Sequence, residues 1–194
     1  MTKAKGENTY QKMIDVAIYL FAKDGIHNTS FSKIAKALNM TKPSLYYYVD
    51  SKEELVAKVF DYIYEDYVFS SYFEDKKLVA KDVASYLIEG GLQFIEEVDE
   101  DGSILNLLQE FTLYANRQKE TKPYFFGKMQ YSKQSFVKGF EKSLLLAGVD
   151  KKQVLQRAQT LALMLANIQS YKKIDENLDE ATLWTFTVKN AIKE

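Results

Sequence analysis

The residues best suited to chemistry in this chain lie between Thr29 and Leu55, in the stretch TSFSKIAKALNMTKPSLYYYVDSKEEL. Within it, Lys42, Ser44 and the three tyrosines at positions 46–48 bring hydrogen-bond donors close together along the chain. Side chains of these types donate to phosphate oxygens and to base edges in protein–DNA interfaces. Their spacing therefore predicts a surface that reads DNA.

Two short helices joined by a tight turn would present these side chains. Ser30 is a suitable N-cap for a first helix over Phe31–Leu38, because its hydroxyl can accept an otherwise unpaired backbone N–H. Asn39 suits the turn, since asparagine tolerates the left-handed conformation that ends a helix. Thr41 caps the second helix, and Pro43 fits its first turn, where a missing N–H costs little. The pattern predicts that this second helix enters the major groove of DNA.

A third helix is predicted to begin at Ser51 and to run to Phe69. Ser51 and Glu54 match the pattern of a capping box, in which the hydroxyl and the carboxylate each accept a backbone N–H from the other end of the motif. The start of such a helix also offers N–H groups and a positive dipole end to a phosphate, and Lys52 adds a full charge. We expect this helix to connect the DNA-reading head with the rest of the chain.

These motifs resemble the N-terminal region of the tetracycline-repressor (TetR) family of bacterial transcriptional regulators. The resemblance runs from about Tyr10 to Phe60 and includes a preceding helix over Tyr10–Lys23 with a turn at Gly25. It implies that bases are read by Ser32, Lys42, Pro43, Ser44 and Tyr47, and that phosphates are bound by Ser30, Thr41, Tyr46, Tyr48 and Lys52. Asn39 replaces a frequent glycine of the family, and Tyr48-Val49 replaces a frequent His-Phe pair. The operator sequence therefore does not follow from the resemblance.

The charge of the chain is divided unevenly. Residues 1–52 contain eight lysines and four acids, a net charge of +4, and since the whole chain carries −1, the remainder carries −5. A positive head attracts phosphate, and a negative body repels it. Lys3 and Lys5 precede the predicted first helix, where we expect a frayed, solvated segment that could also act as a loose arm over the DNA backbone.

The composition argues against several kinds of site. The chain has no cysteine, which excludes disulfides, thiolate metal sites and a cysteine nucleophile. His27 is the only histidine, so neither a His-rich metal site nor a base for a serine nucleophile in the body is available. No signal peptide is recognisable, and the longest apolar run, Leu161–Ala166, is far shorter than the ~20 residues of a membrane span. We expect a cytoplasmic protein without catalytic residues, metal or cofactor, and not an enzyme.

The remaining sequence predicts further helices and no strands. We expect helices over 78–98, 104–118, 122–147, 151–173 and 179–193. This gives an all-α fold, with a helix-turn-helix DNA-binding domain in residues 1–50 and a helical bundle for ligand binding and dimerisation in residues 51–194. Gly90 and Gly91 fall inside a predicted helix, where each costs on the order of 1 kcal/mol relative to alanine, so they predict a kink or a close helix contact.

A homodimer is predicted from the last two helices. The segment 151–173 is apolar nearly all round between Leu161 and Ile168, which requires burial on more than one side. In the family that the head resembles, the last two long helices pair with their copies. We therefore expect a dimer through 151–173 and 179–193, which would match a palindromic operator. The alternative is that both helices are core of a single body.

A ligand cavity in the body is implied by the same resemblance. Aromatic and methionine side chains at helical spacing are its candidate walls, namely Phe94, Phe111, Tyr114, Phe126, Met129 and Phe140. They favour a small apolar or aromatic ligand, although such a stripe is also typical of plain core. The sequence thus predicts a ligand-responsive repressor that binds double-stranded DNA. The alternatives are an inducer-free DNA-binding regulator, and a small-molecule-binding protein or enzyme with a vestigial helix-turn-helix.

Overall fold

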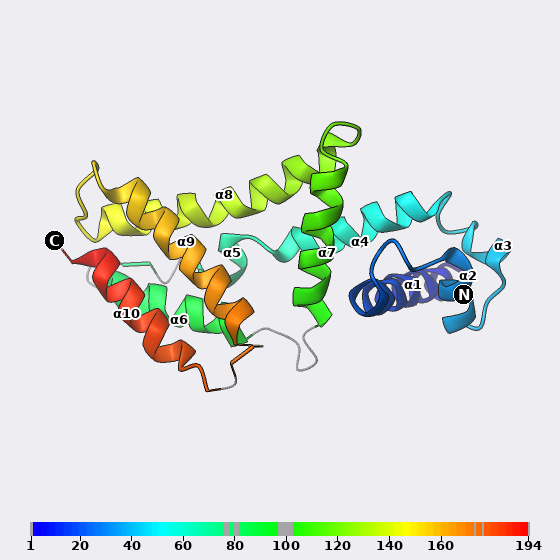
Figure 1. Cartoon of the computed structure of the whole chain (residues 1–194), viewed down its shortest axis with the longest axis horizontal. Helices are drawn as coiled ribbons and strands as arrows, with labels where there is room; N and C mark the ends of the chain where they lie inside the picture. Colours follow the sequence, from blue (N-terminus) through cyan, green and yellow to red (C-terminus); the bar gives the residue numbers. More distant parts are fainter. Residues whose placement is uncertain are drawn as a thin grey trace. The chain divides into compact units, whose positions relative to one another are not determined.

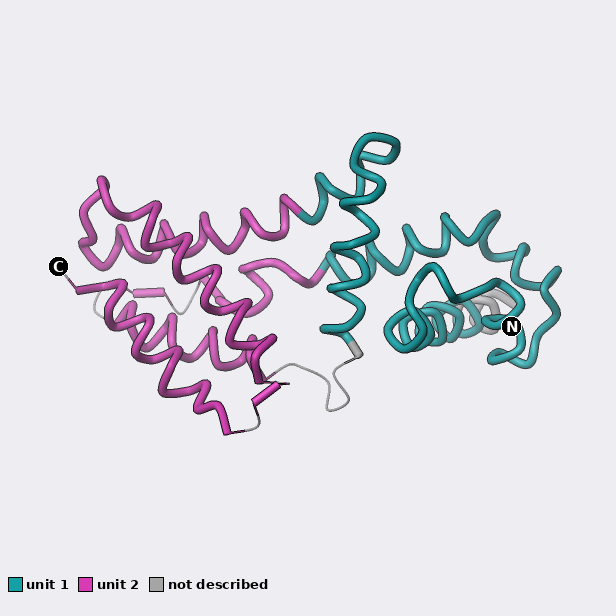
Figure 2. The backbone as a smooth tube through the Cα atoms, in the orientation of Figure 1, with its two compact units in different colours: residues 1–65, 99–129 teal, residues 66–98, 130–194 magenta. Residues whose placement is uncertain are grey.

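In the computed structural model of the chain, the described residues are 2–75, 78–79, 82–96, 103–172, 174–175 and 177–193, with side chains for all of these except 2–7 and 103. Within these ranges the chain forms ten helices and no strand, which confirms the all-α prediction (Figure 1). Contacts between residues divide it into two units (Figure 2). Unit 1 is residues 1–65 and 99–129, and unit 2 is residues 66–98 and 130–194. The predicted functional division at residue 50 stays a prediction.

Unit 1 is built around the first helix. It comprises α1 (Thr2–Asp24), α2 (Phe31–Ala37), α3 (Lys42–Leu45), nearly all of α4 (Lys52–Asp66), α7 (Ser103–Arg117) and the start of α8 (Pro123–Leu146). Helix α1 packs against α7 and α2, and α2 packs against α3. One side of α1 lies in the core, since Met13, Ile14, Ala17 and Phe21 are buried.

An aromatic cluster joins three helices inside unit 1. The ring of Phe60 on α4 stacks on Tyr64, with centroids 4.4 Å apart. It meets Phe111 of α7 edge-on at 4.8 Å and Phe125 of α8 edge-on at 5.1 Å. Offset and edge-to-face pairs of this kind add to the stabilisation from burial. The cluster fixes α4, and hence its N-terminus, against α7.

Unit 2 contains α5 (Phe69–Tyr72), α6 (Val83–Glu96), most of α8, α9 (Val154–Tyr171) and α10 (Glu180–Ile192). Helix α10 packs against α6 and α9. The indole of Trp184 is fully buried, and its Nε1 donates to the carbonyl oxygen of Leu87 at 2.9 Å. A Cβ added to Gly91 would lie less than 3.0 Å from the ring of Trp184. A Cβ added to Gly90 would also lie less than 3.0 Å from the ring of Phe73. The glycine pair therefore allows a close helix contact, one of the two roles predicted for it.

Several helix boundaries differ from the predicted ones. The first helix begins at Thr2 rather than Tyr10, so the segment expected to be frayed is helical in its backbone. Helix α6 begins at Val83 in place of residue 78, and α9 begins at Val154 in place of residue 151. The predicted ends at Val98 and Lys173 lie outside the described residues. Gly148 follows α8 with a φ of 89°, as the predicted stop requires.

The long helix predicted over Ser51–Phe69 is interrupted, which the sequence did not indicate. Helix α4 ends at Asp66, and α5 starts at Phe69. The hydroxyl of Ser132 donates to the carbonyl oxygen of Tyr67, and the N–H of Phe69 donates to Oγ of Ser135 at 3.0 Å. These serines lie 65 and 66 residues away along the chain, so local periodicity could not reveal that they compensate the break.

Candidate nucleic-acid interface

The turn between α2 and α3 has the predicted geometry. Oγ of Ser30 accepts the N–H of Lys33 at 3.2 Å and caps α2. Asn39 adopts a φ of 53°, the left-handed conformation expected of the turn. Oγ1 of Thr41 accepts the N–H of Ser44 at 3.4 Å, and the two hydroxyls are 2.8 Å apart. The caps fix the start of α3, where the residues predicted to read bases begin.

Helix α3 is short, and a buried leucine holds it in place. It covers only Lys42–Leu45, with Pro43 in its first turn. The side chain of Leu45 is fully buried, and its carbonyl oxygen accepts the N–H groups of both Tyr48 and Val49, at 2.9 and 3.2 Å. A helical turn therefore continues past α3 and carries the tyrosines.

The predicted DNA-binding side chains lie at or near the surface of unit 1. Tyr47 is 89% exposed, and Tyr46 is 49% exposed with its ring 5.1 Å from that of Phe31. Tyr48 is half-buried, and its ring lies edge-on to Tyr47 at 5.7 Å. Ser30, Ser32, Thr41, Lys42 and Pro43 are exposed, while Ser44 and Lys52 are half-buried. The structure thus brings nine of these ten onto α2, α3 and the turns beside them, and Lys52 onto the start of α4.

The N-terminus of α4 is capped, with one change from the predicted pattern. The N–H of Glu54 donates to Oγ of Ser51 at 3.0 Å, as expected. The return bond differs, because the Glu54 carboxylate accepts the N–H of Asp50 at 2.6 Å rather than that of Ser51. The ammonium of Lys52 donates to the carbonyl oxygen of His27 at 3.1 Å. Burial lowers the pKa of Lys52, and the nearby Glu53 carboxylate offsets part of that shift.

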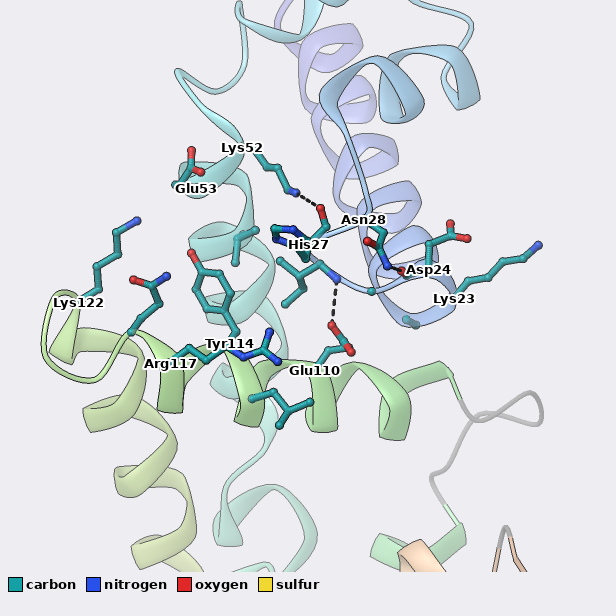
Figure 3. A pocket seen from close by; sticks show the side chains of 16 residues that line it. Lys23, Asp24, His27, Asn28, Lys52, Glu53, Glu110, Tyr114, Arg117 and Lys122 are labelled. Atoms are coloured by element: carbon teal, nitrogen blue, oxygen red, sulfur yellow. Dashed lines mark hydrogen bonds between the residues drawn. The ribbon is translucent and has the colours of Figure 1, made fainter.

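A contact from α7 supports the turn that precedes α2. Gly25 has a φ of 83°, and the carboxylate of Glu110 accepts the N–H of Ile26 at 3.0 Å (Figure 3). The ion pair between Asp24 and Lys33, at 2.7 Å, joins the end of α1 to α2. Nothing in the local sequence singled out Glu110, because its partner is 84 residues away. This residue nevertheless ties α7 to the turn that precedes α2.

Each unit has a cavity of similar size. The cavity in unit 1, about 670 Å³, lies beside the Gly25 turn and is lined mainly by polar and charged groups (Figure 3). The cavity in unit 2, about 680 Å³, is lined mainly by apolar side chains of α8 and α9, together with Tyr67 and Phe94. Among the described residues, no group of three or more acidic or histidine side chains is placed to hold a metal ion. Nor does any helix in the described part of the chain have the length and apolarity to span a membrane.

The six predicted ligand contacts are dispersed. Phe94 lines the cavity in unit 2, and Tyr114 lines the polar cavity in unit 1. Phe111, Met129 and Phe140 are buried in the cores of the two units. Phe126 is half-buried, with the Lys119 ammonium 4.6 Å from its ring centroid. The aromatic spacing did not separate core from cavity, because both use the same residue types.

Helices α9 and α10 carry apolar side chains on two sides, as the apolar segment between Leu161 and Ile168 predicted for α9. Leu161 and Leu165 are buried inside unit 2. On the outer side, Leu163 is 64% exposed, and Phe186 of α10 is 67% exposed. Burial within one chain therefore satisfies only part of the apolar surface of these helices.

Comparison with known proteins gives matches at three levels. Residues 13–59 match the model for bacterial regulatory proteins of the tetR family. The negative transcriptional regulator IcaR of the biofilm operon icaADBC is 39% identical over 84 residues in Staphylococcus epidermidis, a match that covers 43% of this chain and 42% of that protein. The Staphylococcus aureus IcaR is 30% identical over 135 residues, which are 68% of this chain and 67% of that protein.

The fold comparison extends over nearly the whole chain. A TetR-like transcriptional regulator from Rhodococcus sp. RHA1 superposes with a TM-score of 0.72 and 20% sequence identity, covering 95% of each chain. The sequence match to the S. epidermidis regulator spans less than half of that protein, whereas the structural match includes both units. The family model thus matches residues 13–59, whereas the similarity in fold covers nearly the whole chain.

Proposed function

The chain belongs to the TetR family of bacterial regulatory proteins, and on that premise we propose that it is a transcriptional repressor that binds a palindromic operator as a homodimer. The observation that carries the proposal is a set of exposed side chains on and just after a capped, leucine-anchored helix, namely Thr41, Lys42, Pro43, Tyr46 and Tyr47. The two staphylococcal relatives are named as negative regulators, which supports repression. We expect it to act in the cytoplasm, where bacterial DNA lies.

The predicted DNA-binding residues divide into those that would contact bases and those that would contact phosphates. Lys42, Pro43 and Tyr47 project from α3 and the turn after it, where they would meet base edges in the major groove. Ser30 and Thr41 are exposed at the N-caps of α2 and α3, where their hydroxyls would contact phosphates. Contacts of the second kind set the register of the protein on DNA, and contacts of the first kind select the sequence.

DNA binding is tested by selecting sites from a random DNA pool with the purified protein and measuring fluorescence anisotropy on the recovered site. Lys42→Ala should weaken binding by about 1–3 kcal/mol if the lysine touches a base, and should relax the preference at that position. Lys138→Ala, which removes an exposed lysine from α8 in unit 2, is the matched control. Failure to recover any preferred sequence, with the protein folded, would refute the assignment.

The proposed dimer rests on the outer faces of α9 and α10. Leu163 and Phe186 leave large apolar side chains in water, and a two-fold partner would cover them. Sedimentation should show a dimer at micromolar concentration. Leu163→Glu should shift it to monomer, whereas Leu145→Glu, at a 43% exposed position on α8, should not. A wild-type monomer at that concentration would contradict the proposal.

We place the ligand site of this proposal in the apolar cavity of unit 2. Its wall includes Tyr67, Phe94 and Phe136, and Gln159 and Asn167 supply polar groups. A small apolar compound would suit this lining. To act as an inducer, it must bind the DNA-free form more tightly, and operator DNA must weaken its binding by the same factor.

A neutral aromatic probe such as 2-naphthol tests the ligand site. Ala162→Phe, which fills the cavity, should abolish binding of the probe, and Ala22→Ser in the wall of the other cavity should leave it unchanged. Operator titrations with and without the probe then measure the coupling. A probe that binds equally well in both conditions is not an inducer, and the inducer-free alternative would then be favoured.

A further inference from the structure

The polar cavity of unit 1 is built from four parts of the chain. The turn of residues 24–28 forms one side, with His27 and Asn28, and the N-terminus of α4 contributes Lys52. Helix α7 contributes Glu110, Leu113, Tyr114 and Arg117, and Lys122 precedes α8. In Figure 3, Glu110 points from α7 toward the turn, Tyr114 points from α7 toward the start of α4, and Lys52 approaches the turn from α4. The cavity therefore touches both the DNA-reading part of unit 1 and the helix that supports it.

Most acids around this cavity already have partners. Asp24 is paired with Lys33 at 2.7 Å, and the Glu110 carboxylate accepts the N–H of Ile26 at 3.0 Å. These two carboxylates are committed to holding the turn. Glu53 is the remaining acid in the wall, and its negative charge adds to burial in raising the pKa of the Tyr114 phenol.

The cations of the cavity are less completely matched. Among the described residues, no ion pair within 4.0 Å involves Arg117 or Lys122, although both line the cavity. Lys52 is bound only to a neutral carbonyl oxygen, that of His27. Lys23 also lines the cavity, but its ammonium donates to the hydroxyl of Tyr19 at 3.1 Å. Lys52, Arg117 and Lys122 are therefore the three cations of the wall that no carboxylate of the described residues pairs with. Val56, Leu113 and the ring of Tyr114 add an apolar side to this positive cavity.

We propose that this cavity is a second ligand site, which binds a small organic acid with one carboxylate on an apolar or aromatic body. The carboxylate pairs with the guanidinium of Arg117, because a guanidinium presents two parallel N–H groups to two oxygens, and Lys122 adds a second charge. The body of the ligand lies against Leu113 and the ring of Tyr114. Glu53 disfavours ligands with several negative charges, which excludes polyphosphates as the preferred class.

The site also has a route to DNA binding, and this part of the inference depends on the proposed repressor function. Lys52 lines the cavity and stands at the N-terminus of α4, where the resemblance places a phosphate contact. A carboxylate held by Arg117 and Lys122 adds a negative charge to the cavity that Lys52 lines, which weakens the attraction of the Lys52 ammonium group for a DNA phosphate. The organic acid should therefore weaken operator binding, and the operator should weaken binding of the acid by the same factor.

Isothermal titration of the full chain without DNA, with Ala162→Phe filling the cavity of unit 2, tests the site itself. Benzoate and phenylacetate are the probes, benzyl alcohol is the neutral counterpart, and inorganic phosphate is the competing anion. We expect the two carboxylates to bind, and Arg117→Gln to weaken binding by about tenfold or more, since it removes a charge-assisted pair. Lys133→Gln, a cation in the wall of the unit 2 cavity, should leave binding unchanged.

The outcomes separate this proposal from the repressor function. The site is refuted if neither carboxylate binds, if benzyl alcohol binds as well as benzoate, if only phosphate binds, or if Lys133→Gln abolishes binding while Arg117→Gln does not. A thermal melt of Arg117→Gln that matches the wild type shows that the exposed guanidinium was not needed for folding. Carboxylate binding that leaves operator affinity unchanged would overturn only the proposed coupling through Lys52. Failure of DNA binding itself would leave the calorimetric result standing.

Discussion

The two cavities have nearly the same volume and opposite chemistry. The cavity in unit 1 is lined by charged groups at the ends of elements, such as Lys52 at the start of α4 and Arg117 at the end of α7. The cavity in unit 2 is lined by residues in helix interiors, such as Phe136 and Leu165. Helix ends carry unpaired backbone groups and attract charged side chains, whereas interior positions on a buried face are apolar. The position of a cavity relative to helix ends thus sets the class of ligand that it can take.

The largest expected effect is on the free energy of unfolding, and it compares a tightly packed glycine of unit 2 with an exposed glycine of unit 1. Gly91→Ala would drive a methyl group into the buried indole of Trp184 and disturb its hydrogen bond to Leu87. We expect the free energy of unfolding to fall by about 2–4 kcal/mol, from overpacking and the lost bond. Urea denaturation measures this. Gly127→Ala in unit 1, where nothing lies within 4 Å of the added Cβ, should be neutral or slightly stabilising.

A pair of exposed tyrosines compares the surfaces of the two units. Tyr47→Ala removes a ring from the turn after α3, and Tyr131→Ala removes one that is 68% exposed on α8. We expect the first to weaken operator binding by about 1–3 kcal/mol, and the second to have no effect. Anisotropy titration at a fixed salt concentration makes the comparison, since affinity for DNA depends on salt. Equal affinities for both variants and the wild type would show that the turn does not touch DNA.

The support that α7 gives to the turn in unit 1 should be measurable separately. Glu110→Ala removes the acceptor of the Ile26 N–H, whereas Glu110→Gln keeps an oxygen at that position. We expect Glu110→Ala to lower the free energy of unfolding by about 1–2 kcal/mol, and Glu110→Gln to lower it less. Amide hydrogen exchange at Ile26 provides a local readout. Protection that is unchanged in Glu110→Ala would mean that the bond does not hold the turn.

The smallest effect is expected at alkaline pH. Burial raises the pKa of Tyr64 in unit 1 from 10.0 to about 12, and a hydrogen bond with Thr112 offsets part of that shift. Because the folded protein favours the neutral phenol, this contribution to stability is complete below pH 10 and is lost as the pH rises through about 12. At pH 11 the loss should be about 1 kcal/mol. The free energy of unfolding is measured by urea denaturation at a series of pH values. Tyr64→Phe should remove this part of its pH dependence. The same decrease between pH 10 and pH 12 in the variant and the wild type would contradict the prediction.

The sequence by itself determined the features that depend on neighbouring residues. The caps at Ser30 and Thr41 and the left-handed Asn39 follow from interactions within one or two helical turns. The same holds for the all-α class. Local spacing fixes such features because the hydrogen bonds and the helical period involve residues at most a few positions apart. The family resemblance then assigned functions to the exposed side chains of the head.

Only the tertiary structure decided which residues from distant parts of the chain meet. Ser132 and Ser135 form hydrogen bonds with the backbone groups that the break after α4 leaves unpaired. Glu110 accepts the N–H of Ile26, and Trp184 packs against the space beside Gly91. The sequence also could not separate Phe111, which is core, from Phe94, which lines a cavity. Both positions satisfy the same apolar periodicity, and the difference arises only from what packs against them. Burial and cavities depend on how several helices come together, which no single stretch of sequence contains.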